Sequence, residues 1–405
     1  MKKIIVLALL SVLLLSGCTE DLLKERLDDS LATDADVLET VSGNNQFALD
    51  AYAKFRDNSG NVFFSPWSIS SALAMTYEGA REETAAEMKN VFYFSGQDVM
   101  RPSFAKLYNL INFNNEDYQL STANALWAQE DYPFLPEYFE TVASYYDAGL
   151  TNMDFIGATE ASRQTINKWV EDQTNDKIKD LIPAGLITPA TKLVLTNAVY
   201  FKGDWLTQFK EEDTQETDFH VSETETVIVD MMSLFDEEFR YTENTGIQVL
   251  ELPYKGEDLS MLVLLPDDIS SFEESLNTTI LDELKSTLVK QEVEVYLPKF
   301  KFETKYFMAE TLSEMGMPTA FSAAADFSGM TGSKDLMIDQ VIHQAFVEVN
   351  EEGTEAAAAT AVIMKETAAE PQNIFRADKP FIFIIQEDST GSILFMGRVS
   401  NPNQE

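Results

Sequence analysis

The chain has 405 residues, 68 of them acidic and 29 basic, and its net charge of −39 argues against nucleic-acid binding because such a surface repels phosphate backbones. With two histidines and one cysteine, no intramolecular disulfide can form, and a serine-hydrolase triad would have to use one of those histidines. The sequence contains no H-E-x-x-H, C-x-x-C or P-loop motif, so we expect no metal, no cofactor and no enzymatic activity.

Residues 1–17 predict a secretory signal. Two lysines precede an apolar run, Ile4–Leu15, that is too short to span a bilayer comfortably. The run ends in Leu-Ser-Gly-Cys, which resembles the bacterial lipobox and implies that Cys18 is lipidated and anchors the protein to a membrane. The following Thr19-Glu20-Asp21 is similar to surface-export signals of Gram-negative lipoproteins. We therefore expect an exported bacterial lipoprotein of the outer membrane that faces the cell exterior.

Residues 18–41 are predicted to form the lipid anchor and a polar tether, because aspartates are frequent there and aromatic residues are scarce. After this segment no Pro/Gly/Ser-rich linker and no internal repeat divides the chain. We therefore expect one large domain over residues 42–405, and we expect it to be a monomer.

The coarse pattern places helices before strands. Apolar residues recur with helical spacing in 44–56, 70–78, 83–91 and 160–175. Strand-like runs follow at 193–201, 247–252, 259–265, 292–302, 381–385 and 392–399, with a hairpin turn expected at 254–258. This mixture predicts an α+β fold with mainly antiparallel sheets.

A run of small side chains near the C-terminus is the most unusual segment. Residues 350–367 read NEEGTEAAAATAVIMKET, in which Gly353 can adopt a positive φ and act as a hinge. If the run forms a strand, its neutral residues face one side and Glu355 and Lys365 face the other. Composition alone equally allows an alanine-rich helix. The residues at issue are Gly353, Thr354, Glu355, Ala356, Ala357, Ala358, Ala359 and Thr360.

Five segments together resemble the serpin family, in the family's own order. They are Asn61–Ser70 (NVFFSPWSIS), Thr196–Trp205 (TNAVYFKGDW), Val295–Phe300 (VYLPKF), His343–Asn350 (HQAFVEVN) and the closing stretch Phe375–Val399. Each is weak by itself, but five in register make coincidence improbable. The resemblance implies a serpin fold with three mainly antiparallel sheets, eight or nine helices and an exposed reactive-centre loop.

The resemblance also implies a mechanism. A serpin offers the loop after Gly353 as bait to a serine protease, or to a cysteine protease, and forms an acyl-enzyme with it. The loop then inserts into the main sheet as a new strand before hydrolysis is complete, and the protease is trapped. Small hinge residues present no obstacle to insertion, so we read the chain as an inhibitor. The alternative is a non-inhibitory serpin that acts as a decoy substrate or carries a ligand.

Neither histidine requires a catalytic role. His220 is most simply a strand residue near the surface, and His343, between apolar residues, a hydrogen-bonded core residue. The resemblance makes the second reading more specific. It implies that His343 joins Ser65, Ser68 and Asn197 in a buried network that closes the middle of the main sheet.

Three further residues match family positions at the entrance to that sheet. Glu351 and Lys299 correspond to an ion pair where insertion begins, and Trp205 to the tryptophan packed beneath it. Each also has a plainer reading, as a surface ion pair or a core aromatic. One departure from the family pattern is Glu82, which replaces a frequent glycine at a helix start.

The family pattern places the scissile bond at Thr367-Ala368 when it is counted from Glu351. Counting back from Lys379 gives Ala369-Glu370 instead. The small side chains suit elastase-like pockets or tolerant cysteine proteases, whereas Lys365 would attract trypsin-like enzymes. We expect no heparin site because no cluster of basic residues occurs.

Overall fold

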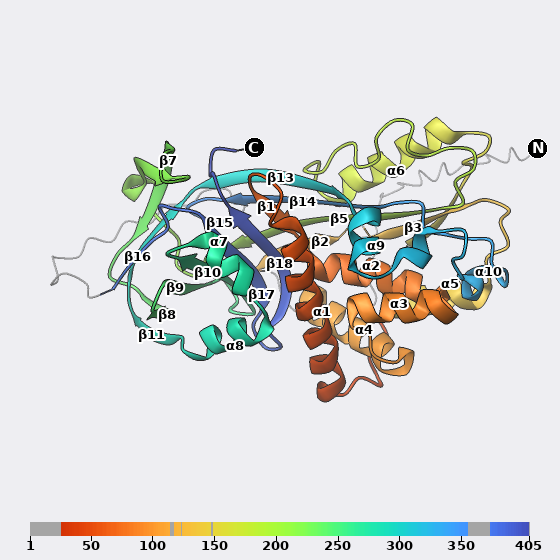
Figure 1. Cartoon of the computed structure of the whole chain (residues 1–405), viewed down its shortest axis with the longest axis horizontal. Helices are drawn as coiled ribbons and strands as arrows, with labels where there is room; N and C mark the ends of the chain where they lie inside the picture. Colours follow the sequence, from red (N-terminus) through yellow and green to blue (C-terminus); the bar gives the residue numbers. More distant parts are fainter. Residues whose placement is uncertain (1–25, 114–116, 123, 147–148, 355–372, 405) are drawn as a thin grey trace, which may run out of the picture.

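The computed structural model describes residues 26–113, 117–122, 124–146, 149–354 and 373–404, which form three β-sheets and ten α-helices. Helices α2 to α5 gather at one end of the molecule, while β7, β8, β11 and β16 lie at the other end (Figure 1). The predicted α+β class is therefore confirmed. The helix count exceeds the expected eight or nine because short segments are included, such as the four-residue α10.

The helices occupy the stretches where helical spacing was expected, and several more. Their bounds are α1 Asp34–Phe55, α2 Pro66–Gly79, α3 Glu82–Phe92, α4 Gln97–Phe113, α5 Pro136–Tyr145, α6 Thr159–Gln173, α7 Ile269–Ser275, α8 Thr278–Ser286, α9 Met308–Met315 and α10 Ser328–Thr331, with 3₁₀ turns η1 Glu211–Asp213 and η2 Pro318–Phe321.

The main sheet runs in the order β13-β14-β15-β5-β3-β4, and β2 also pairs with β5. Its strands are β13 Phe300–Phe307, β14 Val341–Val349, β15 Gly353–Thr354, β5 Leu193–Asp204, β3 Ala125–Gln129, β4 Gly149–Met153 and β2 Tyr118–Thr122. Helix α6 packs on this sheet through Ile166 and Val170, which belong to a cluster with Trp127, Tyr200 and Phe346.

The second sheet runs in the order β1-β18-β17-β10-β9-β8-β11, and every pairing in it is antiparallel. Its strands are β1 Val62–Phe64, β18 Ser392–Val399, β17 Phe381–Glu387, β10 Leu259–Pro266, β9 Ile247–Pro253, β8 Glu238–Asn244 and β11 Val289–Glu292. All residues of β17, β18 and β10 are buried, which places the centre of the core here.

The third sheet has the order β16-β12-β7-β6, with strands β16 Ile374–Arg376, β12 Glu294–Pro298, β7 Thr226–Leu234 and β6 Gln215–His220. The strand-like run at 292–302 therefore contributes to all three sheets, through the last residue of β11, the whole of β12 and the start of β13. It is divided at Lys299, whose backbone N–H donates to the carbonyl of Asp230. The turn expected at 254–258 joins β9 and β10, with Gly256 and Glu257 at positive φ.

The boundary predicted at residue 42 is too late, because it falls inside α1. This helix begins with a capping box in which the Thr33 and Asp36 side chains bond each other's backbone N–H. Val37 and Val41 are buried one turn apart, so the segment read as a polar tether already packs on the domain. Further upstream, the backbone of Leu27 exchanges two hydrogen bonds with the Asn109 amide.

The predicted signal peptide, Cys18 and the residues directly after it lie outside the described part of the chain. Among the residues described, no helix combines the length and the hydropathy that crossing a membrane requires.

Candidate functional site

In the main sheet, strands β14 and β5 pair along part of their length, and β15 then lies between them. We call the place where this change occurs the junction. Strands β14 and β5 pair in parallel from Val341↔Leu195 to Phe346↔Tyr200. Beyond that point β15 lies between them, because Thr354 pairs with both Val349 and Gly203. The chain thus turns back after β14 and enters the sheet as a middle strand.

A tight turn directs the chain into this position. The Asn350 side-chain oxygen accepts hydrogen bonds from the N–H groups of Glu352 (3.1 Å) and Gly353 (3.3 Å). The backbone N–H of Asn350 donates to the Gly353 carbonyl at 2.9 Å. Asparagine side chains commonly organise turns in this manner.

Gly353 is required for space and not for a positive φ, because this glycine does not lie in the left-handed region. A Cβ at this position would come within 2.1 Å of the Gly203 carbonyl oxygen and 2.7 Å of the Asp204 Cα. Both are backbone atoms, so a side chain would force the two strands apart.

Thr354, the next residue, is fully enclosed in the sheet. Its hydroxyl lies 2.8 Å from the Tyr254 hydroxyl, and Tyr254 stacks on Trp205 with the ring centroids 4.7 Å apart. Burial raises the pKa of Tyr254 well above its ordinary value, so the phenol stays neutral. Of the predicted hinge, Gly353 and Thr354 are therefore seated in the sheet. Residues Glu355, Ala356, Ala357, Ala358, Ala359 and Thr360 lie outside the described residues, as do Thr367 and Ala368.

The three predicted entrance residues lie together around this turn. Lys299 Nζ is 3.0 Å from a carboxylate oxygen of Glu351, and the Thr214 hydroxyl donates to the other oxygen at 2.8 Å. Burial opposes ionisation of Glu351, but the bonds from Thr214 and Lys299 outweigh it and lower the pKa of the carboxyl. The Trp205 indole N–H donates to the Asn350 carbonyl at 3.1 Å, which fixes the turn from below.

His343 joins the two strands of the junction and is completely buried. Its Nδ1 is hydrogen-bonded to the Asn197 side-chain oxygen on β5, directly opposite in the strand register. Its Nε2 accepts the backbone N–H of Ser65 at 3.1 Å, so the proton of the neutral ring resides on Nδ1. Burial lowers the pKa of His343 to about 3, and the ring stays uncharged at neutral pH.

The two serines complete this network in different ways. The Ser65 hydroxyl donates to the Leu394 carbonyl at 2.7 Å, and the Ser68 hydroxyl accepts the Asn197 amide at 2.7 Å. Because the Ser65 hydroxyl is turned toward a carbonyl, His343 does not act on it as a base. Sequence reasoning missed Asn124, whose side-chain oxygen accepts from both Ser68 and Asn197. It precedes β3 and lies in none of the matching motifs, so no sequence signal marked it.

His220 lies elsewhere, exposed on the edge strand β6 beside Thr226. In the part of the chain that the structure describes, no three His, Cys, Asp or Glu residues gather closely enough to hold a metal ion.

The departure from the family pattern at Glu82 has a local cost. Glu82 has a φ of +49° at the first position of α3. Non-glycine residues are disfavoured in this left-handed region, which explains a glycine preference here.

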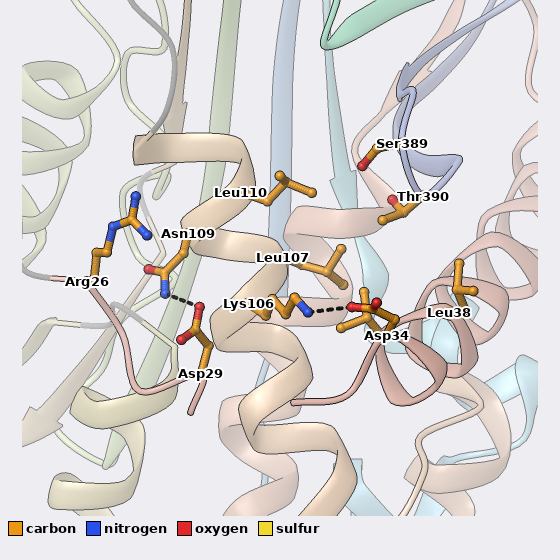
Figure 2. A pocket seen from close by; sticks show the side chains of 11 residues that line it. Arg26, Asp29, Asp34, Leu38, Lys106, Leu107, Asn109, Leu110, Ser389 and Thr390 are labelled. Atoms are coloured by element: carbon orange, nitrogen blue, oxygen red, sulfur yellow. Dashed lines mark hydrogen bonds and ion pairs between the residues drawn. The ribbon is translucent and has the colours of Figure 1, made fainter. Parts of the chain in front are cut away.

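A pocket of about 460 Å³ lies between the first described residues, α1, α4 and the turn between β17 and β18 (Figure 2). Four of its polar side chains bond to one another in two pairs. Lys106 pairs with Asp34 at 2.7 Å, and the Asn109 amide donates to Asp29 at 3.0 Å. A ligand would therefore meet the apolar side chains of Val37, Leu38, Leu107 and Leu110, together with Arg26, Ser389 and Thr390.

Comparisons with known proteins agree with this geometry. A family model described as Serpin (serine protease inhibitor) matches residues 42–402. An uncharacterized serpin-like protein of Methanosarcina acetivorans is 44% identical over all of this chain and 99% of its own length. Human leukocyte elastase inhibitor is 43% identical over 89% of this chain and 99% of its own length.

Solved structures are also similar to this chain. Human thyroxine-binding globulin, solved in complex with its hormone, superimposes with a TM-score of 0.82 at 31% identity, covering 91% of this chain and 100% of that one. The fold and the junction thus define a protein whose main sheet takes up the short strand β15 between β14 and β5. The chain belongs to the serpin family.

Proposed function

We propose that this serpin inhibits serine proteases with elastase-like specificity, and cysteine proteases with tolerant pockets, as a suicide substrate. The observation that carries the proposal is the seating of Gly353 and Thr354 between β14 and β5. An inserting loop would continue from Thr354 along the line where β14 and β5 pair with each other.

Cleavage uses the nucleophile of the protease and the backbone of the inhibitor's loop. The hydroxyl of a serine protease, or the thiolate of a cysteine protease, attacks the Thr367 carbonyl carbon. The bond to the Ala368 nitrogen breaks, and that nitrogen takes up a proton and becomes the free amine of a new N-terminus. An ester, or a thioester with a cysteine protease, then joins Thr367 to the enzyme. The new N-terminus at Ala368 stays with the domain, because β16, β17 and β18 follow it in the chain.

Insertion must replace the parallel pairing between β14 and β5 with two antiparallel ladders. Parallel pairs are slightly less stable per residue, so the exchange is favourable once the loop is cut. Insertion must also part His343 from Asn197 and pass the face covered by α6. Side chains as small as Ala356 and Ala358 suit such a path.

A denaturing gel of the purified domain incubated with pancreatic elastase tests the proposal. We expect a band at the summed mass, and the released C-terminal peptide should begin at Ala368. Ala358→Pro should abolish the complex but not cleavage, because proline cannot donate to a strand ladder. Ala358→Ser is the matched control and should retain the complex. A complex with Ala358→Pro would contradict insertion.

Calorimetry provides an independent check of the stored energy. The chain cleaved in its loop should melt at a higher temperature than the intact chain. Equal melting temperatures would mean that no conformational energy drives the trap.

A second candidate function is that of a ligand carrier or decoy substrate, which the likeness to thyroxine-binding globulin favours. The pocket between α1 and α4 has a suitable volume, but four of its polar side chains bond to one another in two pairs. Clean cleavage by elastase without a covalent complex would support this alternative.

We further propose that the protein is exported, carries lipid on Cys18 and is held as a monomer on the outer face of the outer membrane. The Leu-Ser-Gly-Cys sequence supports this placement. Cys18→Ser should shift the protein from the membrane fraction to the soluble fraction.

A further inference from the structure

An exposed cluster of interface-type side chains lies on the outer face of the third sheet. Ile374 is 47% and Phe235 is 42% exposed, although both are large and apolar. The Phe235 ring meets the edge of Tyr296 with centroids 6.0 Å apart, and the Arg376 guanidinium lies 3.5 Å from the centre of the same ring. Phe235, Tyr296, Ile374 and Arg376 are called the sheet-edge patch below.

The strand register makes this patch continuous. Tyr296 pairs with Arg376 across β12 and β16, and Ile374 lies two residues before Arg376 on the same face of its strand. Their neighbours Val295 and Phe375 are buried on the opposite face. Tyrosine, phenylalanine and arginine are enriched at protein interfaces, whereas large apolar residues that are exposed singly need no explanation.

The short chain length between the proposed scissile bond and the patch indicates that the bound protease is the partner that contacts it. Ile374 follows the proposed scissile bond by about six residues, which an extended chain spans in at most about 20 Å. A protease of about 230 residues has a radius of gyration of about 17 Å, so one that holds this bond is large enough to reach the patch. Figure 1 shows β7 and β16 at the same end of the molecule.

We propose that the sheet-edge patch is a second docking surface for the protease that cleaves the loop. This inference rests on the proposed protease recognition. The partner is a serine protease of net positive charge, which the charge of −39 steers toward the inhibitor. The rim of its active site presents apolar side chains to Phe235 and Ile374 and a carboxylate to Arg376.

The test measures how fast elastase reacts with surface variants. Phe235→Ser combined with Ile374→Ser should lower the second-order rate constant of complex formation about tenfold, the size expected when central interface residues are lost. Arg376→Ala should lower it severalfold, because the local pair with a carboxylate of the protease is lost. The stoichiometry of inhibition and the melting temperature should stay unchanged.

Ile228→Ser is the matched control. Ile228 is 55% exposed on β7, seven residues from Phe235 and thus about 23 Å away along the strand. Its removal should leave the rate within twofold of the unaltered protein. Equal rates for the patch variants and this control would overturn the proposal.

Repeating the measurement in the Ala358→Pro background separates docking from insertion. There elastase only cleaves the loop, and the patch variants should still lower kcat/KM about tenfold, because docking precedes acylation. If the unaltered protein forms no covalent complex, inhibition fails, yet this cleavage rate still decides whether the patch binds the protease. An unchanged kcat/KM would refute the patch in either case.

Discussion

The second sheet and the junction of the main sheet are built in opposite ways. Around β17 the core is apolar and aromatic, with Phe63 stacked on both Phe383 and Phe395. At the junction, strands β14 and β5 pair in parallel, and polar side chains led by His343 and Asn197 bridge them.

The difference assigns a separate task to each region. Close-packed apolar contacts tolerate little rearrangement, so we expect the second sheet to be the same in the intact and the loop-cleaved chain. A buried polar network is specific. Under the proposed mechanism it would be exchanged, because an inserted strand would supply new backbone partners to β14 and β5. The proposal therefore requires a junction that holds the intact form and opens after cleavage.

The largest expected effect comes from removing a large side chain from the core around the second sheet. Phe383→Ala removes a buried ring that also packs on Phe300 and should lower the free energy of unfolding by about 3–5 kcal/mol. Denaturant unfolding of the intact chain and of the loop-cleaved chain should show similar losses, since both contain this sheet. A loss confined to the intact chain would contradict the comparison.

The polar network at the junction should make the folded state less stable at acid pH. The folded pKa of His343 is about 3, whereas an unfolded histidine titrates near about 6.5, so the unfolded chain binds the proton more readily between these values. Stability should therefore fall as the pH drops below about 6.5, by about 2 kcal/mol from this residue at pH 5.

His343→Gln provides the control for this pH dependence. Burial also raises the pKa of Asp388 to about 6, which has the opposite sign and stabilises the fold as the pH falls. Asp388 is present in both proteins, so the difference between their unfolding free energies isolates His343. Identical slopes between pH 6.5 and 5 would show that the ring is not held neutral.

Sequence motifs located the junction well because its side chains lie in segments of regular strand and helix. The matches placed His343, Asn197, Ser65 and Ser68, and the structure brings all four together. They did not reveal that Ser65 contacts the imidazole through its backbone N–H. That choice depends on the approach of Leu394, a contact distant in sequence.

Two sequence-based interpretations differ from the structure, and each difference has a specific cause. Gly353 was expected for its backbone freedom, but its reason is the Gly203 carbonyl on another strand, which no local pattern contains. The start of α1 was missed because aspartates suggested a tether, although Thr33 and Asp36 have capping-box spacing and Val37 and Val41 lie one turn apart. Attention to caps would have corrected this boundary.

A smaller effect is expected at the entrance to the sheet. Glu351→Gln removes an ion pair whose lysine, Lys299, is 37% exposed, so solvent screening should limit the loss to about 1 kcal/mol. A double-mutant cycle with Lys299→Met measures the coupling. The pair Lys301 and Glu348, with the lysine more exposed, is the control and should couple by less than about 0.5 kcal/mol. Equal coupling energies in both pairs would show that the Lys299–Glu351 pair is no stronger than an ordinary surface ion pair.

The smallest effect should be a gain in stability away from both regions. Glu82→Gly relieves a left-handed residue at the start of α3 and should raise the free energy of unfolding by about 0.5 kcal/mol, after the entropy cost of glycine and the loss of a first-turn carboxylate. Glu83→Gly is the matched control one residue later. Glu83 has no positive φ, so glycine there should cost about 1 kcal/mol. Because α3 packs mainly on η2, α1 and α2, Glu82→Gly should leave the stoichiometry of inhibition unchanged. A loss of stability equal to that of the control would mean that the left-handed backbone stores no strain.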